Sequence, residues 1–317
     1  MELVIKAAFF SLVYVWSNIK CNMGTFSDFL HKIKHQDTSE KTTLYCRDIT
    51  VKLFKDYIKY RQDRGNTNET INKALTPIIK AVKIMHRRDW IDRGTCDEIC
   101  NLYLPANAKV LGADTTTHYL TSEQVKQLIE TVKSAKYDRT RDIFDMFMFS
   151  LHTCGLRFSD VATLRWAEID MDKRTIKHIQ VKNHTRNAKM LCLSIPDEGM
   201  KILERWQGRN DNFVFGLLDD EFDLTDCARL KETLNSKNRT INISLKTLGD
   251  KINLPFPLHF HIARHTFATL ALNNTVDIKT ISTLMGHSSV LTTEKVYATL
   301  MSSTIEKTVE EKLNFHF

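Results

Sequence analysis

Three separated stretches after residue 150 concentrate arginine and histidine, together with one late tyrosine. A guanidinium is permanently charged and can bond two phosphate oxygens at once. An imidazole takes up or releases a proton near pH 7, and a tyrosine hydroxyl can act as a nucleophile. If the fold brings such groups together, they suit chemistry at a phosphate. The stretches are residues 153–160 with Arg157, residues 261–269 with His261 and Arg264, and residues 284–297 with His287 and Tyr297.

Each stretch alone has a plainer interpretation. Arg157 could form an ion pair with Asp160 one helical turn later, and Tyr297 could be an ordinary residue of an amphipathic core. The histidines could be hydrogen-bonded polar groups at helix ends. A metal cluster of His259, His261 and His265 is a further alternative, although Arg264 stands among them and carboxylate ligands do not flank them.

Taken together and in this order, the stretches resemble the motifs of the tyrosine recombinase (phage-type integrase) family. The family pattern T-G-L-R-x-S-[ED]-x-x-x-L-x-W is matched by residues 154–166, with cysteine in place of the usual threonine. The pattern H-x-x-R-H-[ST]-x-A-T is matched by residues 261–269. The pattern L-[GM]-H-x-S-x-x-T-T-x-x-Y corresponds to residues 285–297. The resemblance covers about residues 45–315.

The resemblance implies a site-specific DNA recombinase (integrase) that cuts and rejoins duplex DNA. Its tyrosine, here Tyr297, would displace a 5′ hydroxyl from a phosphodiester and leave a 3′-phosphotyrosine intermediate. The bond energy is retained in that link, so we expect no cofactor. Arg157 and Arg264 would stabilise the negative charge that the phosphate gains. Because two guanidiniums neutralise charge as a metal ion would, we also expect no metal.

The remaining site residues follow from the same resemblance. His261 would assist removal of the Tyr297 proton, and His287 would donate a hydrogen bond to a phosphate oxygen. Lys182 would act as the general acid that protonates the leaving 5′ oxygen. It occupies the family's usual place, but Asn183 follows it where threonine is expected, and Lys189 is an alternative.

Two supporting roles complete this expectation. Asp160 corresponds to the family's acidic position and would orient Arg157 or His265 by accepting a hydrogen bond. His265 is the second histidine of the H-x-x-R-H pattern.

The tyrosine departs from the family in one respect. His287 and Tyr297 are ten positions apart, one more than usual, and one extra residue rotates a side chain by about 100° on a continuous helix. A bulge or loop must absorb it if Tyr297 is the nucleophile. The preceding tyrosine is Tyr137, so Tyr297 has no competitor in the motif. Because of this spacing, one alternative is that the chain is a DNA-binding relative of these enzymes that has lost cleavage activity. A type IB topoisomerase-like or telomere-resolving enzyme with the same chemistry is also open.

The elements that must position these residues are mainly helices. With 10 Gly and 5 Pro in 317 residues, the chain favours long helices over a many-turned β fold. Residues 175–181 and 190–195 are β-type runs on either side of a basic tip, which predicts a hairpin. Residues 121–124 form a capping-box pattern, and residues 139–153 predict a buried helix. Ser159 and Asp160 are a plausible cap for the short helix that follows.

The fold class we expect is mainly α with a small β-sheet or hairpin. It comprises a helical core-binding domain and a mixed α/β catalytic domain of the tyrosine recombinase type. The boundaries are an unassigned segment 1–44, a helical core DNA-binding domain 45–103, a linker 104–117 and a catalytic domain 118–317 that ends in a docking helix.

Two amphipathic helices are predicted before the linker, over residues 50–65 and 66–91. Pro77 should kink the second helix or mark its true start. The same helix carries a stripe of four cations at spacings of 7, 3 and 4. Alone, this stripe could be a solvated face, but beside the recombinase motifs it predicts a contact with duplex DNA. The four are Lys73, Lys80, Lys83 and Arg87.

The net charge and the cysteines constrain the compartment in which the protein works. The formal net charge is +7, and the first 117 residues hold 18 Lys and Arg against 13 Asp and Glu, a net of +5. The seven cysteines are scattered without a C-x-x-C pair, which favours a reducing compartment. We expect a cytoplasmic, nucleoid-associated protein with no membrane span. The apolar residues 3–16 are too short to cross a bilayer and fit a packed element better than a signal peptide.

The C-terminal tail predicts a helix with one apolar stripe, formed by Ile305, Val309 and Leu313 after a capping-box pattern at residues 303–306. Packing within the chain is one explanation. The resemblance implies instead that this helix docks on a neighbouring protomer. The expected assembly is then a homotetramer on paired DNA sites, with C-terminal helices exchanged in a ring.

Overall fold

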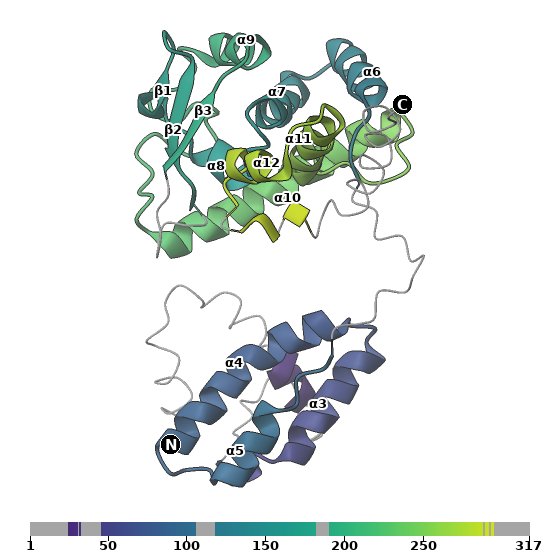
Figure 1. The fold of residues 1–317 in the computed structure, drawn as a ribbon, viewed down its shortest axis with the longest axis vertical. Helices are drawn as coiled ribbons and strands as arrows, with labels where there is room; N and C mark the ends of the chain where they lie inside the picture. The colour runs from purple at the N-terminus through teal and green to yellow at the C-terminus, as the bar shows by residue number, and fades with distance from the viewer. Residues whose placement is uncertain are drawn as a thin grey trace, which may run out of the picture. The chain divides into compact units, whose positions relative to one another are not determined.

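The computed structural model describes residues 25–30, 32, 46–105, 118–181, 190–287, 289–291 and 293–294. The chain divides into two compact units, Met1–Ala113 and Asp114–Phe317, each with its own hydrophobic core (Figure 1). Both units are mainly helical, and the second also contains a three-stranded antiparallel sheet. The predicted fold class, mainly α with a small sheet, is therefore confirmed.

The first unit is built from a short 3-10 helix, η2 (Cys46–Asp48), and three α-helices, α3 (Val51–Asp63), α4 (Asn68–Arg87) and α5 (Arg93–Cys100). Residues 25–30 and 32 are also helical. Phe26 and Phe29 from this segment are buried against Tyr57, with ring centroids 5.0 Å and 5.3 Å away. Part of the unassigned segment 1–44 thus completes the core of this unit.

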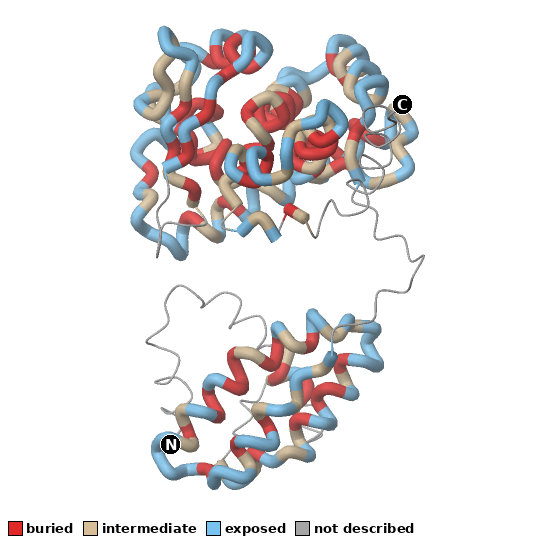
Figure 2. Tube along the Cα trace, in the orientation of Figure 1, coloured by how far each residue is buried: buried red, intermediate tan, exposed pale blue. Residues whose placement is uncertain are grey.

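Helix α4 begins directly after its N-cap residue, Thr67. The Thr67 side chain accepts a hydrogen bond from the Thr70 backbone N–H at 3.3 Å, and the helix continues without a break through the buried Pro77. The alternative that Pro77 marks the start of the helix is therefore wrong, because Thr67 has already provided the cap. The buried residues of α4 are apolar. Figure 2 shows buried and exposed residues alternating along this helix.

The second unit is arranged around α7 (Asp138–His152), which is buried on several sides. It packs against α6 (Ser122–Lys133), α9 (Asp197–Trp206), α10 (Cys227–Lys251) and α11 (His261–Asn273) (Figure 1). Phe147 and Phe149, both inaccessible to solvent, fill the centre of this core. The predicted capping box at the start of α6 is confirmed, because Thr121 and Gln124 exchange both hydrogen bonds.

The remaining elements flank this core. They are α8 (Phe158–Thr163), η3 (Trp166–Glu168), the strands β1 (Ile169–Asp170), β2 (Thr175–Ile179) and β3 (Met190–Ser194), and α12 (Ile278–Leu284). The sheet order is β1-β2-β3, and β2 pairs antiparallel with β3 in a register that sets His178 opposite Leu191. The two predicted hairpin strands are therefore confirmed.

The cap predicted for α8 is wrong. The N-cap residue is Arg157, with no side-chain cap hydrogen bond, and Ser159 and Asp160 lie inside the first turn. Asp160 instead accepts a hydrogen bond from the Val181 backbone N–H through its Oδ1 atom, at 3.0 Å. Its carboxylate therefore ties α8 to the backbone just after β2 rather than capping its own helix.

Several predicted features lie outside the described residues. These are Lys182, Lys189, Tyr297, most of the linker 104–117 and the C-terminal helix with its apolar stripe. Across the described parts of both units, every helix is too short or too polar to cross a membrane.

Candidate active site

Arg264 is held in place by two backbone carbonyls. It lies in the first turns of α11 and is 2% exposed. Its Nη1 donates a hydrogen bond to the Gly155 carbonyl and its Nη2 donates one to the Met285 carbonyl, each at 2.7 Å. The orientation of this guanidinium is therefore set by two segments that lie far from it in the sequence.

Gly155 allows this close approach. Its φ is +69°, in the left-handed region, and a Cβ atom at this position would lie 2.9 Å from the Arg264 Cα. Gly286 makes a similar contact, because with a φ of +64° its Cβ would lie 2.5 Å from the Gln180 amide nitrogen. The glycines of two motifs thus let the backbone pack directly against Arg264 and against the Gln180 side chain.

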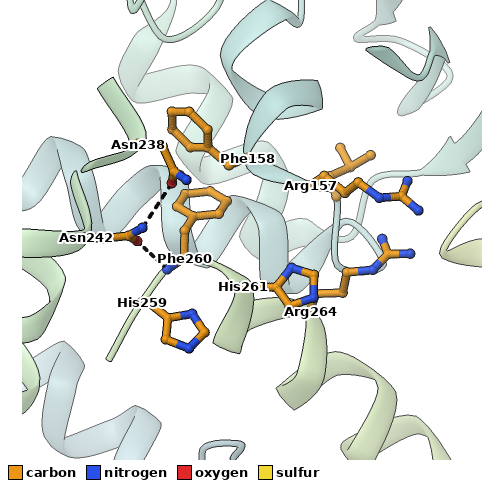
Figure 3. Close-up of a pocket in the computed structure, with 9 residues that line it drawn as sticks. Arg157, Phe158, Asn238, Asn242, His259, Phe260, His261 and Arg264 are labelled. Atoms are coloured by element: carbon orange, nitrogen blue, oxygen red, sulfur yellow. Dashed lines mark hydrogen bonds between the residues drawn. The ribbon is translucent and has the colours of Figure 1, made fainter. Parts of the chain in front are cut away.

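Arg157 stands beside Arg264, at the N-terminal end of α8. Its side chain is 18% exposed, and Nη1 lies 3.8 Å from the Asp160 Oδ2. Burial lowers the pKa of Arg157, and the Asp160 carboxylate partly opposes this effect. In Figure 3 the two arginine side chains extend in the same direction. Two guanidiniums in this arrangement could bind one phosphate.

The first two turns of α11 carry two histidines in contact. The rings of His261 and His265 are 4.6 Å apart and nearly perpendicular. Burial, followed by the charge of His261 and other neighbours, lowers the pKa of His265 to about 3. His265 is therefore neutral at pH 7, and its imidazole packs against His261 as an uncharged ring.

An asparagine on α10 supports the same turn. Asn242 accepts a hydrogen bond from the Phe260 backbone N–H at 2.8 Å and donates one to the Asn238 side chain at 3.2 Å (Figure 3). Because Phe260 directly precedes His261, Asn242 anchors the start of α11. Sequence reasoning missed both asparagines, since an Asn within a long helix carries no motif.

The two arginines, His261 and the two asparagines line one cavity of about 230 Å³. It brings together three of the predicted catalytic residues: Arg157, His261 and Arg264. The other lining residues are Leu156, Phe158, Asn238, Asn242, His259 and Phe260 (Figure 3).

His287 lies beyond the end of α12. Its Nδ1 is 2.7 Å from the Oγ1 of Thr293, a residue with no exposed surface. A partner on Nδ1 fixes the orientation of the ring and presents Nε2. The sequence signal for Thr293 is the T-T pair in its motif, from which no role for the hydroxyl could be read. Thr293 lies six residues after His287, at the family spacing, so the additional residue falls between Thr293 and Tyr297.

The alternative of a histidine metal site finds no support in the described parts of the chain. They contain no group of three or more His, Cys, Asp or Glu side chains placed to hold a metal ion.

The four cations predicted to contact DNA belong to the first unit. Lys73, Lys80, Lys83 and Arg87 all lie on α4, whose apolar side is buried in the core. Their spacings place them within one narrow arc of the helix.

Known proteins match this chain over most of its length. The sequence model of the phage integrase family matches residues 118–303, more than half of the chain. The tyrosine recombinase XerC of Pediococcus pentosaceus is 26% identical over 267 residues, which cover 81% of this chain and 80% of XerC. The ICEBs1 integrase of Bacillus subtilis is 23% identical over 277 residues, covering 84% and 71% of the two chains.

A solved structure has the same fold. It is the Tn1549 transposon integrase in complex with transposon right end DNA. The two chains superpose with a TM-score of 0.61 at 17% identity, over 98% of this chain and 99% of the other.

Proposed function

Because this chain belongs to the phage integrase family, whose members are DNA cutting and rejoining enzymes, we propose that it is a site-specific recombinase acting through a 3′-phosphotyrosine intermediate. The observation that carries this proposal is the cavity that Arg157, His261 and Arg264 line together. Tyr297 is the proposed nucleophile. Its oxygen bonds to the scissile phosphorus as the bond from phosphorus to the 5′ oxygen breaks.

The two arginines supply the electrostatic part of this reaction. The pentavalent phosphate gains negative charge, and groups already oriented toward it stabilise the transition state without reorganising. Arg264 is fixed by the carbonyls of Gly155 and Met285, so its position does not depend on the substrate. Arg157 approaches from α8 and completes the pair.

Proton transfers complete the cycle. A tyrosine with an ordinary pKa near 10 is a weak nucleophile, so a base must take its proton, and His261 has this role. Lys182 gives a proton to the leaving 5′ oxygen. His287, whose Nδ1 faces Thr293, donates to a phosphate oxygen through Nε2. Rejoining reverses these transfers with a 5′ hydroxyl from the exchanged strand.

Duplex DNA is the proposed partner, and the cationic stripe of α4 contributes phosphate contacts. Synapsis of two sites calls for a homotetramer, with the helix around residues 303–313 docked on the neighbouring protomer. A DNA substrate also places the enzyme in the cytoplasm, at the nucleoid.

A trapping experiment tests the chemistry. A binding site is first selected from a random duplex library with the whole chain, and a nick is then placed so that the cleaved fragment diffuses away. The wild-type protein should form a covalent adduct on a denaturing gel, and Tyr297→Phe should form none. If the protein binds its selected sites without forming an adduct, it is a DNA-binding relative that has lost cleavage. An adduct that persists in Tyr297→Phe would exclude this nucleophile.

The same protein distinguishes recombination from DNA relaxation. We expect strand exchange between two duplexes that carry the selected site. Relaxation of a supercoiled plasmid without exchange would favour the topoisomerase-like alternative.

A further inference from the structure

A buried row of charged side chains joins β2 to the start of α8. The His178 side chain is 4% exposed, with Nδ1 3.1 Å from the Glu168 Oε1 and Nε2 3.7 Å from the Asp160 Oδ1. The other oxygen of Asp160 lies 3.8 Å from the Arg157 Nη1. The order along the row is Glu168, His178, Asp160, Arg157. Its last member is one of the two arginines of the active site.

Two carboxylates in this row call for two cations, because a buried charge without a partner is costly. The charged groups that face His178 are Asp160 from α8 and Glu168 from η3, whereas its partner on β3, Leu191, is apolar. Burial by itself lowers the pKa of His178, but the two carboxylates outweigh it and raise the pKa to about 9. His178 is then an imidazolium at neutral pH, and the row carries no net charge.

The Asp160 carboxylate lies between two cations at nearly equal distances. His178 lies 3.7 Å away on one side and Arg157 3.8 Å away on the other. Among the described residues, Oδ2 of Asp160, Nη1 of Arg157 and Nε2 of His178 have no hydrogen-bond partner, so charge attraction rather than hydrogen bonding acts between these three groups. With a neutral His178, Coulomb attraction would draw the guanidinium toward the carboxylate. A guanidinium paired closely with Asp160 has fewer donors left for a phosphate.

Asp160 also holds the backbone that leads to the predicted general acid. Its Oδ1 accepts the hydrogen bond from Val181, the residue directly before Lys182. The same carboxylate therefore faces Arg157 and fixes the backbone at Val181, two residues after β2. A displacement of Asp160 would be transmitted to both.

We infer that His178 is a positioning residue for strand cleavage, which holds the Asp160 carboxylate so that Arg157 stays available to the scissile phosphate. This inference rests on the proposed function, because it takes a phosphate to be the ligand of Arg157. His178 does not touch the reacting atoms and acts through Asp160. A purely structural role would stabilise the junction of β2 and α8 without affecting the Arg157 guanidinium.

The first test needs neither DNA nor cleavage. The whole chain is labelled with ¹⁵N-histidine and ¹⁵N-arginine, and His178→Gln and Arg157→Lys assign the two signals by NMR. We expect His178 to remain an imidazolium up to about pH 9, and the Arg157 signals to shift in the same step. Arg157 signals that stay constant while His178 titrates, or a His178 that loses its proton below pH 7, would overturn the inference. Because cleavage is not measured, a failure here is distinct from a failure of the proposed function.

The second test measures the consequence for the reaction. Single-turnover cleavage at saturating nicked DNA should be about 10-fold slower in His178→Gln at pH 7.5, with an unchanged DNA dissociation constant. The wild-type rate should also decline as the pH rises through about 9, and the variant should lack this decline. Lys177→Gln, on the exposed side of the same strand, is the matched control and should behave as wild type. A variant with a lower melting temperature but a wild-type rate and pH profile would show a structural role alone.

Discussion

The two units of this protein place positive charge in opposite ways. On α4 of the first unit, Lys80 and Lys83 are exposed and lie opposite the core. In the second unit, Arg264 is 2% exposed and bonded to two backbone carbonyls, and the Arg157 side chain is 18% exposed. The same kind of charge is solvated in one unit and oriented and desolvated in the other.

This difference implies that the exposed cations contribute to DNA affinity and the buried arginines to the rate of cleavage. Exposed charges are screened over about 10 Å at 0.1 M salt, so their contribution to DNA binding depends steeply on ionic strength. Buried, oriented charges are screened much less and act at one point in space. We therefore expect changes on α4 to alter binding and changes around Arg264 to alter the rate. Four predictions, from the largest expected effect to the smallest, test this separation.

Arg264→Lys should reduce single-turnover cleavage by about 10³-fold, because an ammonium cannot bond both carbonyls and still present a planar face to the phosphate. The salt dependence of DNA binding should stay close to that of the wild type. Cleavage is measured on the nicked duplex, and binding by fluorescence anisotropy at several salt concentrations. Arg209→Lys, at a surface pair with Asp142, is the control and should leave the rate unchanged. Equal losses in both variants would contradict a special role for Arg264.

Replacing Lys73, Lys80 and Lys83 together by Gln should weaken DNA binding on the order of 10²-fold near 0.1 M salt. The slope of log affinity against log salt should fall by about 0.9 for each phosphate that the variant no longer neutralises. Cleavage at saturating DNA should be unchanged.

The matched control removes the same number of charges from another helix of the same unit. Lys52, Lys55 and Lys59 are exposed on α3, and their replacement by Gln should change the slope far less. If both triple variants lower the slope equally, the stripe has no special place in DNA binding and net charge alone decides it.

Gly155→Ala should lower the free energy of unfolding by about 3 kcal/mol, because it combines a left-handed backbone with a clash against Arg264. Gly208→Ala meets the same backbone restriction at a φ of +76° but has open space around its Cβ. This control should cost about 1 kcal/mol. Urea denaturation measures both, and Gly155→Ala alone should slow cleavage. Equal stabilities for the two variants would show that the close approach to Arg264 is easily relieved.

Thr293→Val should slow cleavage about 5-fold, which corresponds to removal of one hydrogen bond of about 1 kcal/mol to His287. Thr293→Ser keeps the hydroxyl and should retain most of the activity. A wild-type rate in Thr293→Val would indicate that His287 is oriented without this hydrogen bond.

Local patterns in the sequence predicted much of the fold. The capping box at Thr121 and Gln124 was predicted because its contacts lie within one helical turn. The cap that Thr67 provides was not predicted, although it is equally local and residue order could have shown it. Phe26 and Phe29 also have helical spacing and could have been found by it, although segment 1–44 matches no motif. Ser159 and Asp160 have the residue types of a cap, but the carboxylate of Asp160 accepts a hydrogen bond from the Val181 backbone, 21 residues away and just after β2.

For this protein, the sequence by itself determined the family, the mainly helical fold and the residue types of the site, because motif letters and periodicity are local properties. Only the tertiary structure decided how those residues are held. The hydrogen bond from Arg264 to Gly155 spans 109 residues, and the row from Glu168 through His178 to Asp160 joins three elements. Such contacts depend on how helices and strands pack, and burial then sets their charge, as the opposite pKa shifts of His178 and His265 show.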